Sequence, residues 1–322
     1  MKKIALLCSG GDAPGMNCAV RAVVRSAISM DIVPYGIMRG YQGLLEGNFT
    51  EMSASSVGNI MQHGGTILQT SRCLEFHEAD IRKEAANILK RKGMDGLIVI
   101  GGNGSFAGAG LLSKEHKIPV VGIPATIDND ISGTDYTIGF DTAVQTAVDA
   151  VDKIRDTAHS HARTFIVEVM GRNSAAIAMH VGICTGAENI IFPFEKIDID
   201  QIAEDVNNGR KRGKQASIII CAEGDEPGLS YTIREGLESK YKLKSHVCIL
   251  GHIQRGGNPS SLDRFLASRM GFVAIDSLRK GLFPTVTAYI EGKVSPVPLE
   301  NCLQKRDHYL PENMELIKIL SI

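Results

Sequence analysis

The segment Pro124–Asp130 carries a hydroxyl group and two carboxyl groups within a few residues. Thr126, Asp128 and Asp130 alternate along it, and it follows Val120–Ile123, a short β-branched apolar run typical of a buried strand. If the chain stays extended, these three side chains project from the same side of the backbone. They would lie at the carboxyl end of the strand, where open parallel sheets bind ligands. Such a cluster could deprotonate an alcohol and hold a divalent cation. The alternative is an Asx-rich surface turn, because Asp and Asn also favour turns.

Two glycine-rich segments follow other apolar runs. Gly10–Gly15 comes after Ile4–Cys8, and Gly101–Ser105 comes after Gly96–Ile100. Glycines let backbone N–H groups approach a phosphate, and the N-terminus of a following helix favours an anion. The first loop matches neither the dinucleotide-binding nor the Walker A pattern, because no Lys-Ser/Thr follows Gly15. A plain tight turn between strand and helix is therefore the alternative.

Arginines near these loops are candidate phosphate contacts. Arg21 and Arg25 are four residues apart on the expected helix 16–30, so they share a face. They repel each other unless an anion or a carboxylate lies between them, and a solvated face is the alternative. Arg72 lies in the hydroxyl-rich stretch 70–73, where it is either a phosphate contact or a surface residue.

The elements that must position these residues alternate along the chain. Further strands are expected at 32–38, 163–170, 189–192, 217–222, 246–250 and 285–290. Helices are expected at 16–30, 79–92, 138–155, 200–212, 260–281 and 313–322, and Arg39–Leu45 is expected to be a loop. This order predicts a doubly wound α/β sheet and a second layered domain with its own sheet. No low-complexity linker separates the two halves, so they are expected to be interwoven.

Composition excludes several classes of protein. The 322 residues carry a formal net charge of −1 and no Trp, which argues against a nucleic-acid partner. The seven cysteines include no CxxC pair, which favours reduced thiols in a cytoplasmic protein. The N-terminal apolar run is shorter than the core of a signal peptide, and no stretch is long enough to span a membrane.

Four separated motifs occur together in this chain. They are Gly10–Asn17, Pro124–Asp130, Met170–Arg172 and Leu250–Gly257. Together they resemble the bacterial ATP-dependent 6-phosphofructokinases, and the likeness covers essentially the whole chain. It implies an α/β protein of two Rossmann-like three-layer domains with largely parallel sheets and the active site in the cleft between them. The ATP-binding domain would hold residues 1–138 plus 256–305, and the fructose 6-phosphate-binding domain residues 139–255 plus 306–322.

The resemblance also implies a reaction of glycolysis, in which the γ-phosphoryl of MgATP passes to the 1-hydroxyl of fructose 6-phosphate. Asp128 corresponds to the general base that takes the hydroxyl proton. The catalytic set that it implies is Asp128, Thr126, Gly11, Arg72 and Arg172, with Asn103 and Asp130 at the Mg²⁺ ion. The implied ATP-binding residues are Gly11, Arg72, Cys73, Gly102, Asn103, Gly104 and Ser105. The implied substrate-binding residues are Thr126, Asp128, Arg163, Met170, Gly171, Arg172, Glu223, His246, His252 and Arg255.

Regulation and assembly follow from the same resemblance. It implies a homotetramer whose sites are completed by neighbouring subunits, and ADP or phosphoenolpyruvate as effectors. The implied allosteric residues are Arg21, Arg25, Arg155, Gly186, Glu188, Arg212 and Lys214. For Arg21 and Arg25, this favours the anion-binding interpretation over a solvated face.

The sequence departs from the family pattern at two chemically important positions. Asn103 stands where the family has an Asp ligand of the catalytic Mg²⁺, so we expect weaker metal positioning and a slower chemical step. His246 stands where the family has an Arg that grips the 6-phosphate, and losing that charged contact would weaken sugar-phosphate binding by roughly tenfold to a hundredfold. Gly104 and Ala125 disfavour pyrophosphate as the donor. The alternative to a working kinase is a catalytically weakened or non-catalytic nucleotide-binding regulatory paralogue, which could mix with an active paralogous subunit.

Overall fold

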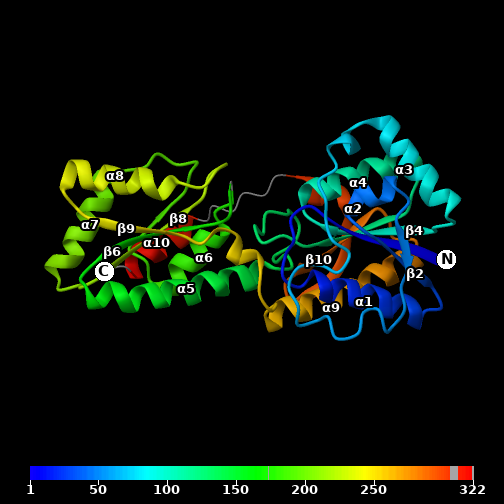
Figure 1. Ribbon diagram of the computed structural model, residues 1–322, viewed down its shortest axis with the longest axis horizontal. Coiled ribbons are helices and arrows are strands. Elements are labelled where there is room, and N and C mark those ends of the chain that lie inside the picture. Colours follow the sequence, from blue (N-terminus) through cyan, green and yellow to red (C-terminus); the bar gives the residue numbers. More distant parts are fainter. Residues whose placement is uncertain (173, 305–310, 321–322) are drawn as a thin grey trace. The chain divides into compact units, whose positions relative to one another are not determined.

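The computed structural model describes residues 1–172, 174–304 and 311–320. Two compact units emerge (Figure 1), one made of the described residues of Met1–Thr142 and Arg255–Arg306, the other of those of Ala143–Gln254 and Asp307–Ile322. The parts of the predicted domains at residues 305–310 and 321–322 lie outside the described residues. Each unit has its own sheet, so the α/β prediction with two sheets is confirmed.

The first unit is built on a seven-stranded sheet with the order β11-β10-β5-β4-β1-β2-β3. Its strands are β1 (Lys3–Ser9), β2 (Val33–Ile37), β3 (Phe49–Glu51), β4 (Gly96–Gly101), β5 (Val120–Pro124), β10 (Thr285–Ile290) and β11 (Lys293–Pro298). The five central strands are parallel, and the two edge strands pair antiparallel. Strands β4 and β5 are buried along their whole length, as continuous apolar runs in a parallel sheet must be.

Helices cover both faces of this sheet. They are α1 (Met16–Ser29), α2 (Gly40–Leu45), α3 (Ala79–Arg91), α4 (Asn103–His116) and α9 (Ser261–Arg279). Figure 1 shows α1 and α9 together on one face, with α2, α3 and α4 on the other. The second group packs on the sheet through a core that includes Leu89, Phe106 and Leu112. The sheet therefore lies between two helical layers, with its strand ends open for loops.

The second unit has a four-stranded, fully parallel sheet with the order β7-β8-β6-β9. Its strands are β6 (Thr164–Val169), β7 (Asn189–Ile191), β8 (Ser217–Ala222) and β9 (Ser245–Ile249). Its helices are α5 (Phe140–Ser160), α6 (Ala176–Thr185), α7 (Ile199–Lys211), α8 (Leu229–Tyr241) and α10 (Pro311–Leu320). Helices α7 and α8 share a core with the sheet through Ile202, Val206 and Leu237, and Figure 1 shows α5 on the opposite face.

One predicted loop is a helix. Arg39 takes a left-handed conformation (φ 61°) after β2, and α2 begins at once. Tyr41 and Leu44 are buried, and a side chain at Gly43 would meet the Met38 carbonyl at 1.5 Å, so only glycine fits there. The expectation of a loop at Arg39–Leu45 was wrong because tertiary burial stabilises a helix of only six residues.

Besides α2, two strands and one α-helix were not predicted. β3 and β11 are edge strands, and two prolines in β11 weaken its sequence signal. α8 contains Tyr231, Thr232 and Gly236, which have low helix propensity. Among the described residues, no helix combines the length and the apolar character needed to cross a membrane.

Candidate active site

The acidic segment after β5 is a turn. β5 ends at Pro124, and Asn129 has a left-handed backbone (φ 49°), so Thr126, Asp128 and Asp130 do not continue the strand. The extended arrangement expected from their alternation is wrong, and the turn alternative describes the backbone. The segment still lies at the carboxyl end of a central parallel strand, where ligands bind in such sheets.

Asn129 holds this turn in place. Its Oδ1 accepts the main-chain N–H of Thr137 at 2.9 Å, and its Nδ2 donates to the main-chain oxygen of Asp135 at 3.1 Å. The Thr137 hydroxyl in turn donates to the main-chain oxygen of Thr126 at 2.6 Å. Sequence reasoning missed this positioning residue, although Asn is one of the few residues that tolerate a positive φ. The buried Asn129 amide therefore fixes the backbone that carries Asp128 and Asp130.

The two predicted metal residues lie in direct contact. Asn103 begins α4, and its Nδ2 donates to Oδ2 of Asp130 at 2.8 Å and to the main-chain oxygen of Asp130 at 3.3 Å. Burial raises the pKa of the Asp130 carboxyl, while hydrogen bonds from its own backbone and from Asn103 oppose that rise. A carboxylate and an amide oxygen are the hard donors that Mg²⁺ prefers, so this pair fits the ion. The described residues hold no group of three or more His, Cys, Asp or Glu side chains suited to a metal.

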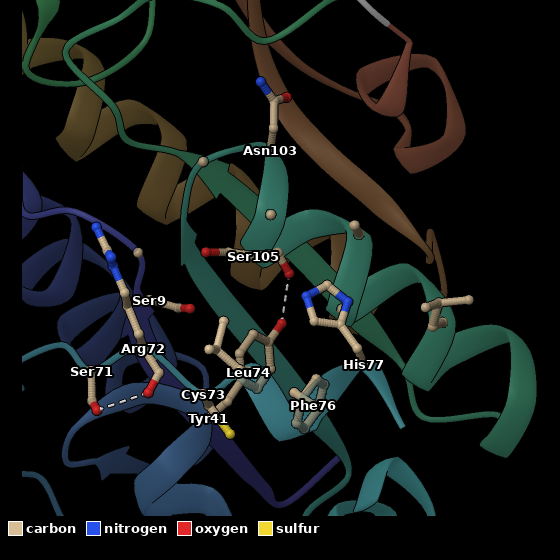
Figure 2. A pocket seen from close by; sticks show the side chains of 16 residues that line it. Ser9, Tyr41, Ser71, Arg72, Cys73, Leu74, Phe76, His77, Asn103 and Ser105 are labelled. Carbon is tan, nitrogen blue, oxygen red and sulfur yellow. Dashed lines mark hydrogen bonds between the residues drawn. The ribbon is translucent and has the colours of Figure 1, made fainter. Parts of the chain in front are cut away.

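A cavity of about 260 Å³ lies beside the N-terminus of α4 (Figure 2). It gathers six of the seven predicted ATP-binding residues: Arg72, Cys73, Gly102, Asn103, Gly104 and Ser105. Gly11 is not among its lining residues, but its neighbour Gly10 is. Lining residues that were not predicted include Ser9, Tyr41, Leu74, Phe76, His77, Gly108 and Leu111.

One wall of this cavity is aromatic. The rings of Tyr41 and Phe76 stack with centroids 4.0 Å apart, and the Tyr41 hydroxyl donates to the main-chain oxygen of Ser105 at 2.7 Å. A side chain at Gly108 would meet the Phe76 ring at 3.0 Å, so glycine lets the ring lie close against α4. The cavity thus joins an apolar wall to glycine-rich backbone and Arg72, an arrangement suited to a flat base attached to phosphates.

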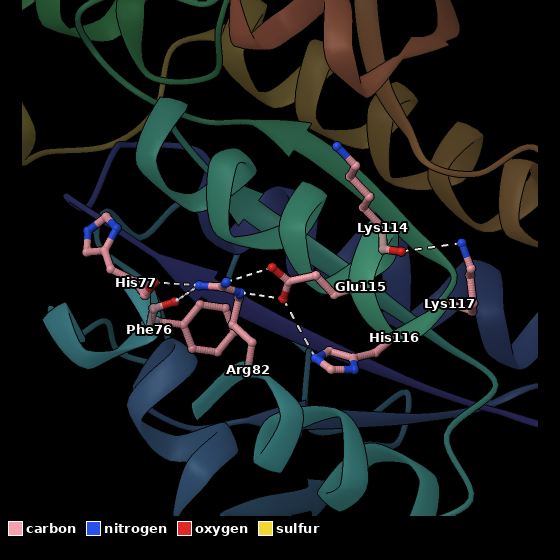
Figure 3. Close-up of polar contacts among 7 residues, drawn as sticks. All are labelled: Phe76, His77, Arg82, Lys114, Glu115, His116 and Lys117. Atoms are coloured by element: carbon pink, nitrogen blue, oxygen red, sulfur yellow. Dashed lines mark hydrogen bonds and ion pairs between the residues drawn. The ribbon is translucent and has the colours of Figure 1, made fainter. Parts of the chain in front are cut away.

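A buried arginine supports that wall (Figure 3). Arg82 of α3 contacts both carboxylate oxygens of Glu115, at 2.6 and 2.7 Å. Its remaining nitrogen donates to the main-chain oxygens of Phe76 and His77 at 3.0 and 2.7 Å. The Arg82 guanidinium holds the pKa of Glu115 below its usual value. Arg82 therefore ties the 3₁₀ helix Leu74–His77 to the C-terminal end of α4.

The first glycine-rich loop lies against Arg255. A side chain at Gly11 would meet Nη1 of Arg255 at 2.4 Å, and this nitrogen donates to the main-chain oxygen of Asp12 at 3.2 Å. Gly15, with φ 103°, directly precedes α1, and the first turn of α1 contains no acidic side chain. The loop thus brings backbone N–H groups and a guanidinium together, which suits a phosphate.

In the second unit, several predicted substrate residues share one edge of the sheet. Met170, Gly171 and Arg172 follow β6, Glu223 follows its neighbour β8, and His252 follows β9. The main-chain N–H of Met170 donates to Oε1 of Gln254 at 2.8 Å. Gln254 is fully buried and was not predicted; it fixes the backbone at the start of this group.

Arg163 and His246 are not part of this edge. Arg163 precedes β6, and His246 pairs with Phe165 near the start of β6 and β9, at the opposite end of the strands. The exposed His246 ring lies on the Phe165 ring, with centroids 5.2 Å apart. Within this unit the structure therefore separates these two residues from the other predicted substrate contacts.

Five of the seven predicted allosteric residues belong to the second unit. Arg155 donates to the main-chain oxygens of Thr185 and Gly186 at 2.5 and 3.5 Å. Nζ of Lys214 lies 3.0 Å from Oε1 of the buried Glu188. Glu188 and Arg212 line a cavity of about 410 Å³ that α10 also lines, through Met314, Ile317 and Lys318. These three residues were not predicted. Arg21 and Arg25 lie on α1 of the first unit.

The family model described as Phosphofructokinase matches residues 3–278 of the chain. The chain belongs to the phosphofructokinase family. The resemblance inferred from the four motifs is thereby confirmed.

Curated relatives of this phosphofructokinase match from end to end. A Staphylococcus epidermidis protein named ATP-dependent 6-phosphofructokinase is 48% identical over 324 residues, which is 100% of both chains. A Thermus thermophilus protein named ATP-dependent 6-phosphofructokinase 1 is 45% identical over 322 residues, again with 100% of both chains covered.

Solved phosphofructokinases share the fold. Pichia pastoris phosphofructokinase in the T-state superposes on 99% of this chain with a TM-score of 0.89 and 33% identity. The match spans 38% of the Pichia chain, so this phosphofructokinase corresponds to less than half of that polypeptide. A pyrophosphate-dependent phosphofructokinase from Marinobacter aquaeolei has a TM-score of 0.84 at 20% identity, a likeness of fold alone.

Proposed function

We propose that this phosphofructokinase transfers the γ-phosphoryl group of MgATP to the 1-hydroxyl of fructose 6-phosphate, the step that its family performs in glycolysis. The observation that carries the proposal is the contact between Asn103 and Asp130. Asn103 lines the cavity beside α4, and Asp130 lies two residues from Asp128. The contact links the cavity to the turn 126–130, and this turn carries Asp128, a carboxylate that can accept a proton. The names of the full-length relatives support the same activity.

Phosphoryl transfer needs positioning and charge neutralisation more than covalent chemistry. In this proposal the first unit binds ATP, with Arg72 and Gly11 near the phosphates, and Arg255 beside Gly11 would contact the sugar phosphate. Asp128, with Thr126 beside it, accepts the proton of the attacking hydroxyl. Asp130 and Oδ1 of Asn103 would hold Mg²⁺, which supplies neutralisation of phosphate charge when it is bound.

The second unit would bind the sugar phosphate through the residues at its sheet edge. These are Met170, Gly171, Arg172, Glu223 and His252. Arg163 and His246, at the other end of the strands, would serve a neighbouring subunit of a homotetramer. Exposed apolar side chains on α9, Phe265 and Phe272, support an assembly that covers them.

The anchored cluster in the second unit would bind an effector, either ADP or phosphoenolpyruvate. Arg155, Gly186, Glu188, Arg212 and Lys214 form its part in this unit. Arg21 and Arg25 would contribute from another subunit. We place the protein in the cytoplasm, which the seven free cysteines support.

One observation favours a second candidate, the weakened or non-catalytic regulatory paralogue. The Asn103 amide contributes no negative charge to the metal site, and in this structure it presents its N–H groups to Asp130. A protein with this site could bind nucleotide and still transfer phosphate slowly, either alone or mixed with an active paralogous subunit.

A coupled assay decides between the two candidates. Purified protein is given Mg²⁺, fructose 6-phosphate and either ATP or pyrophosphate, and formation of the 1,6-bisphosphate is followed. The proposal predicts turnover with ATP and none with pyrophosphate. Nucleotide binding without any turnover would overturn it and leave the regulatory paralogue, and turnover with pyrophosphate alone would overturn both.

A further inference from the structure

The side chain of Asn103 covers the carboxylate to which a cation would bind. Its Nδ2 lies 2.8 Å from Oδ2 of Asp130 and 3.3 Å from the main-chain oxygen of Asp130. Both partners are acceptors, and this fixes the orientation of the amide, because only its NH₂ group can donate to them. Oδ1 of Asn103 therefore faces away from Asp130.

A metal ion changes which atom of Asn103 must face Asp130. Mg²⁺ binds oxygen and is repelled by N–H groups, so Asn103 cannot donate to Asp130 and share an ion with it in the same rotamer. Rotation of the amide by about half a turn around its terminal bond exchanges Nδ2 for Oδ1. A carboxylate at this position would present an oxygen in either orientation and would have no such choice.

A free cation finds no dense cluster of ligands at this place. Among the residues that the structure describes, no group of three or more His, Cys, Asp or Glu side chains could hold a metal ion. An ion that arrives without phosphate ligands would have to break the amide contact, and fewer than three acidic, His or Cys side chains could bind it in return. An ion that arrives on a nucleotide brings phosphate oxygens with it.

We propose that Asn103 is a latch that takes the place of the cation in the nucleotide-free protein. The N–H groups of Asn103 neutralise part of the Asp130 charge and tie the start of α4 to the turn 126–130. The latch opens by amide rotation when a divalent cation enters with the nucleotide. The opening step rests on the proposed function, but the closed latch does not. The latch makes the apo protein indifferent to free Mg²⁺.

The test is thermal unfolding of nucleotide-free protein in EDTA and in millimolar Mg²⁺. Wild type is expected to melt at the same temperature in both. In N103D two carboxylates face each other without a counter-ion, so in EDTA it should melt about 5 °C lower than wild type, and Mg²⁺ should restore most of the loss. N87D makes the same chemical change at an exposed position of α3, where no cation effect is expected.

A second variant separates the latch from simple packing. N103L removes the donor without adding charge, so it should melt lower than wild type in both solutions. If N103D unfolds outright in EDTA but folds in Mg²⁺, that is the same result in a stronger form. The latch is refuted if N103D matches N87D in EDTA, or if Mg²⁺ alone raises the wild-type melting temperature as much as it raises that of N103D. Because this readout involves no turnover, failure of the kinase assay would refute the proposed function and leave the latch standing.

Discussion

At the scale of single residues, His246 is the departure from the family pattern that we expect to weaken binding of fructose 6-phosphate. A histidine lacks the permanent charge and the paired donors of an arginine. Its ring packs against the apolar ring of Phe165 on the surface of β6 and β9. If it meets the 6-phosphate of a neighbouring subunit's substrate, it cannot offer the paired donors that an arginine would offer.

The substitution H246R should lower the KM for fructose 6-phosphate by roughly tenfold to a hundredfold at pH 8, with little change in kcat. The reason is that arginine carries a permanent charge and can donate two parallel hydrogen bonds to one phosphate. H246K, which adds the charge without the fork, should lower KM less. Steady-state kinetics of the three proteins at pH 8 would test this. An unchanged KM in H246R would show that residue 246 does not contact the phosphate.

At the scale of elements, α4 links the metal pair to the wall of the nucleotide cavity. Its first residue contacts Asp130, its middle carries Gly108 against Phe76, and Glu115 near its end holds Arg82. Arg82 is almost fully buried, and two of its hydrogen bonds end on the backbone that carries the aromatic wall. Neither residue of this ion pair lines the cavity, so the pair would shape the cavity only through the backbone of residues 74–77.

The substitution R82M should lower stability by about 2 kcal/mol, because Glu115 loses its partner and two carbonyls lose their donor. Nucleotide binding should weaken about tenfold as residues 74–77 lose their anchor. R82K keeps the charge but not the bidentate geometry, so it should fall between wild type and R82M. Denaturant unfolding and titration calorimetry with ADP would measure the two effects. Loss of stability with an unchanged ADP affinity would mean that Arg82 does not shape the cavity.

Some of the elements could be predicted from the sequence, and others could not. The buried strands β1, β4, β5, β6 and β8 were predictable, because a continuous apolar run has few other ways to be buried. The glycine loops were predictable from their places after such strands, whereas the proposed ATP-binding residues near α4 rest on the family resemblance. The roles of Asn129, Gln254 and Arg82 were not, because each depends on partners distant in the sequence. α2 was missed for a related reason, since it forms through burial of Tyr41 and Leu44.

At the scale of the whole molecule, α5 carries the chain from the first unit into the second, and one buried carboxylate holds its beginning. Asp263 of α9 has no exposed surface. It accepts the main-chain N–H groups of Gly139 and Thr142 at 2.8 and 2.9 Å, and the Thr142 hydroxyl at 2.5 Å. Burial raises the pKa of Asp263 to about 6, although these hydrogen bonds oppose the rise.

That pKa has a predictable effect on stability. The folded state holds the proton of Asp263 more tightly than the unfolded chain, so this group favours folding below about pH 4 and loses that contribution as pH rises through about 6. Relative to D263N, wild type should therefore gain up to about 3 kcal/mol between pH 7 and pH 4. Urea unfolding of both proteins across this range would measure the difference. Parallel pH profiles would contradict the raised pKa.

The central claim is that Asp128 accepts the proton in an ATP-dependent phosphoryl transfer to fructose 6-phosphate. The most direct test compares kcat of wild type and D128N at saturating ATP and fructose 6-phosphate, with ADP affinity measured in parallel. Loss of a general base should lower kcat by about a hundredfold or more and leave the ADP dissociation constant within about twofold. A D128N protein that turns over fructose 6-phosphate at the wild-type rate would contradict the account.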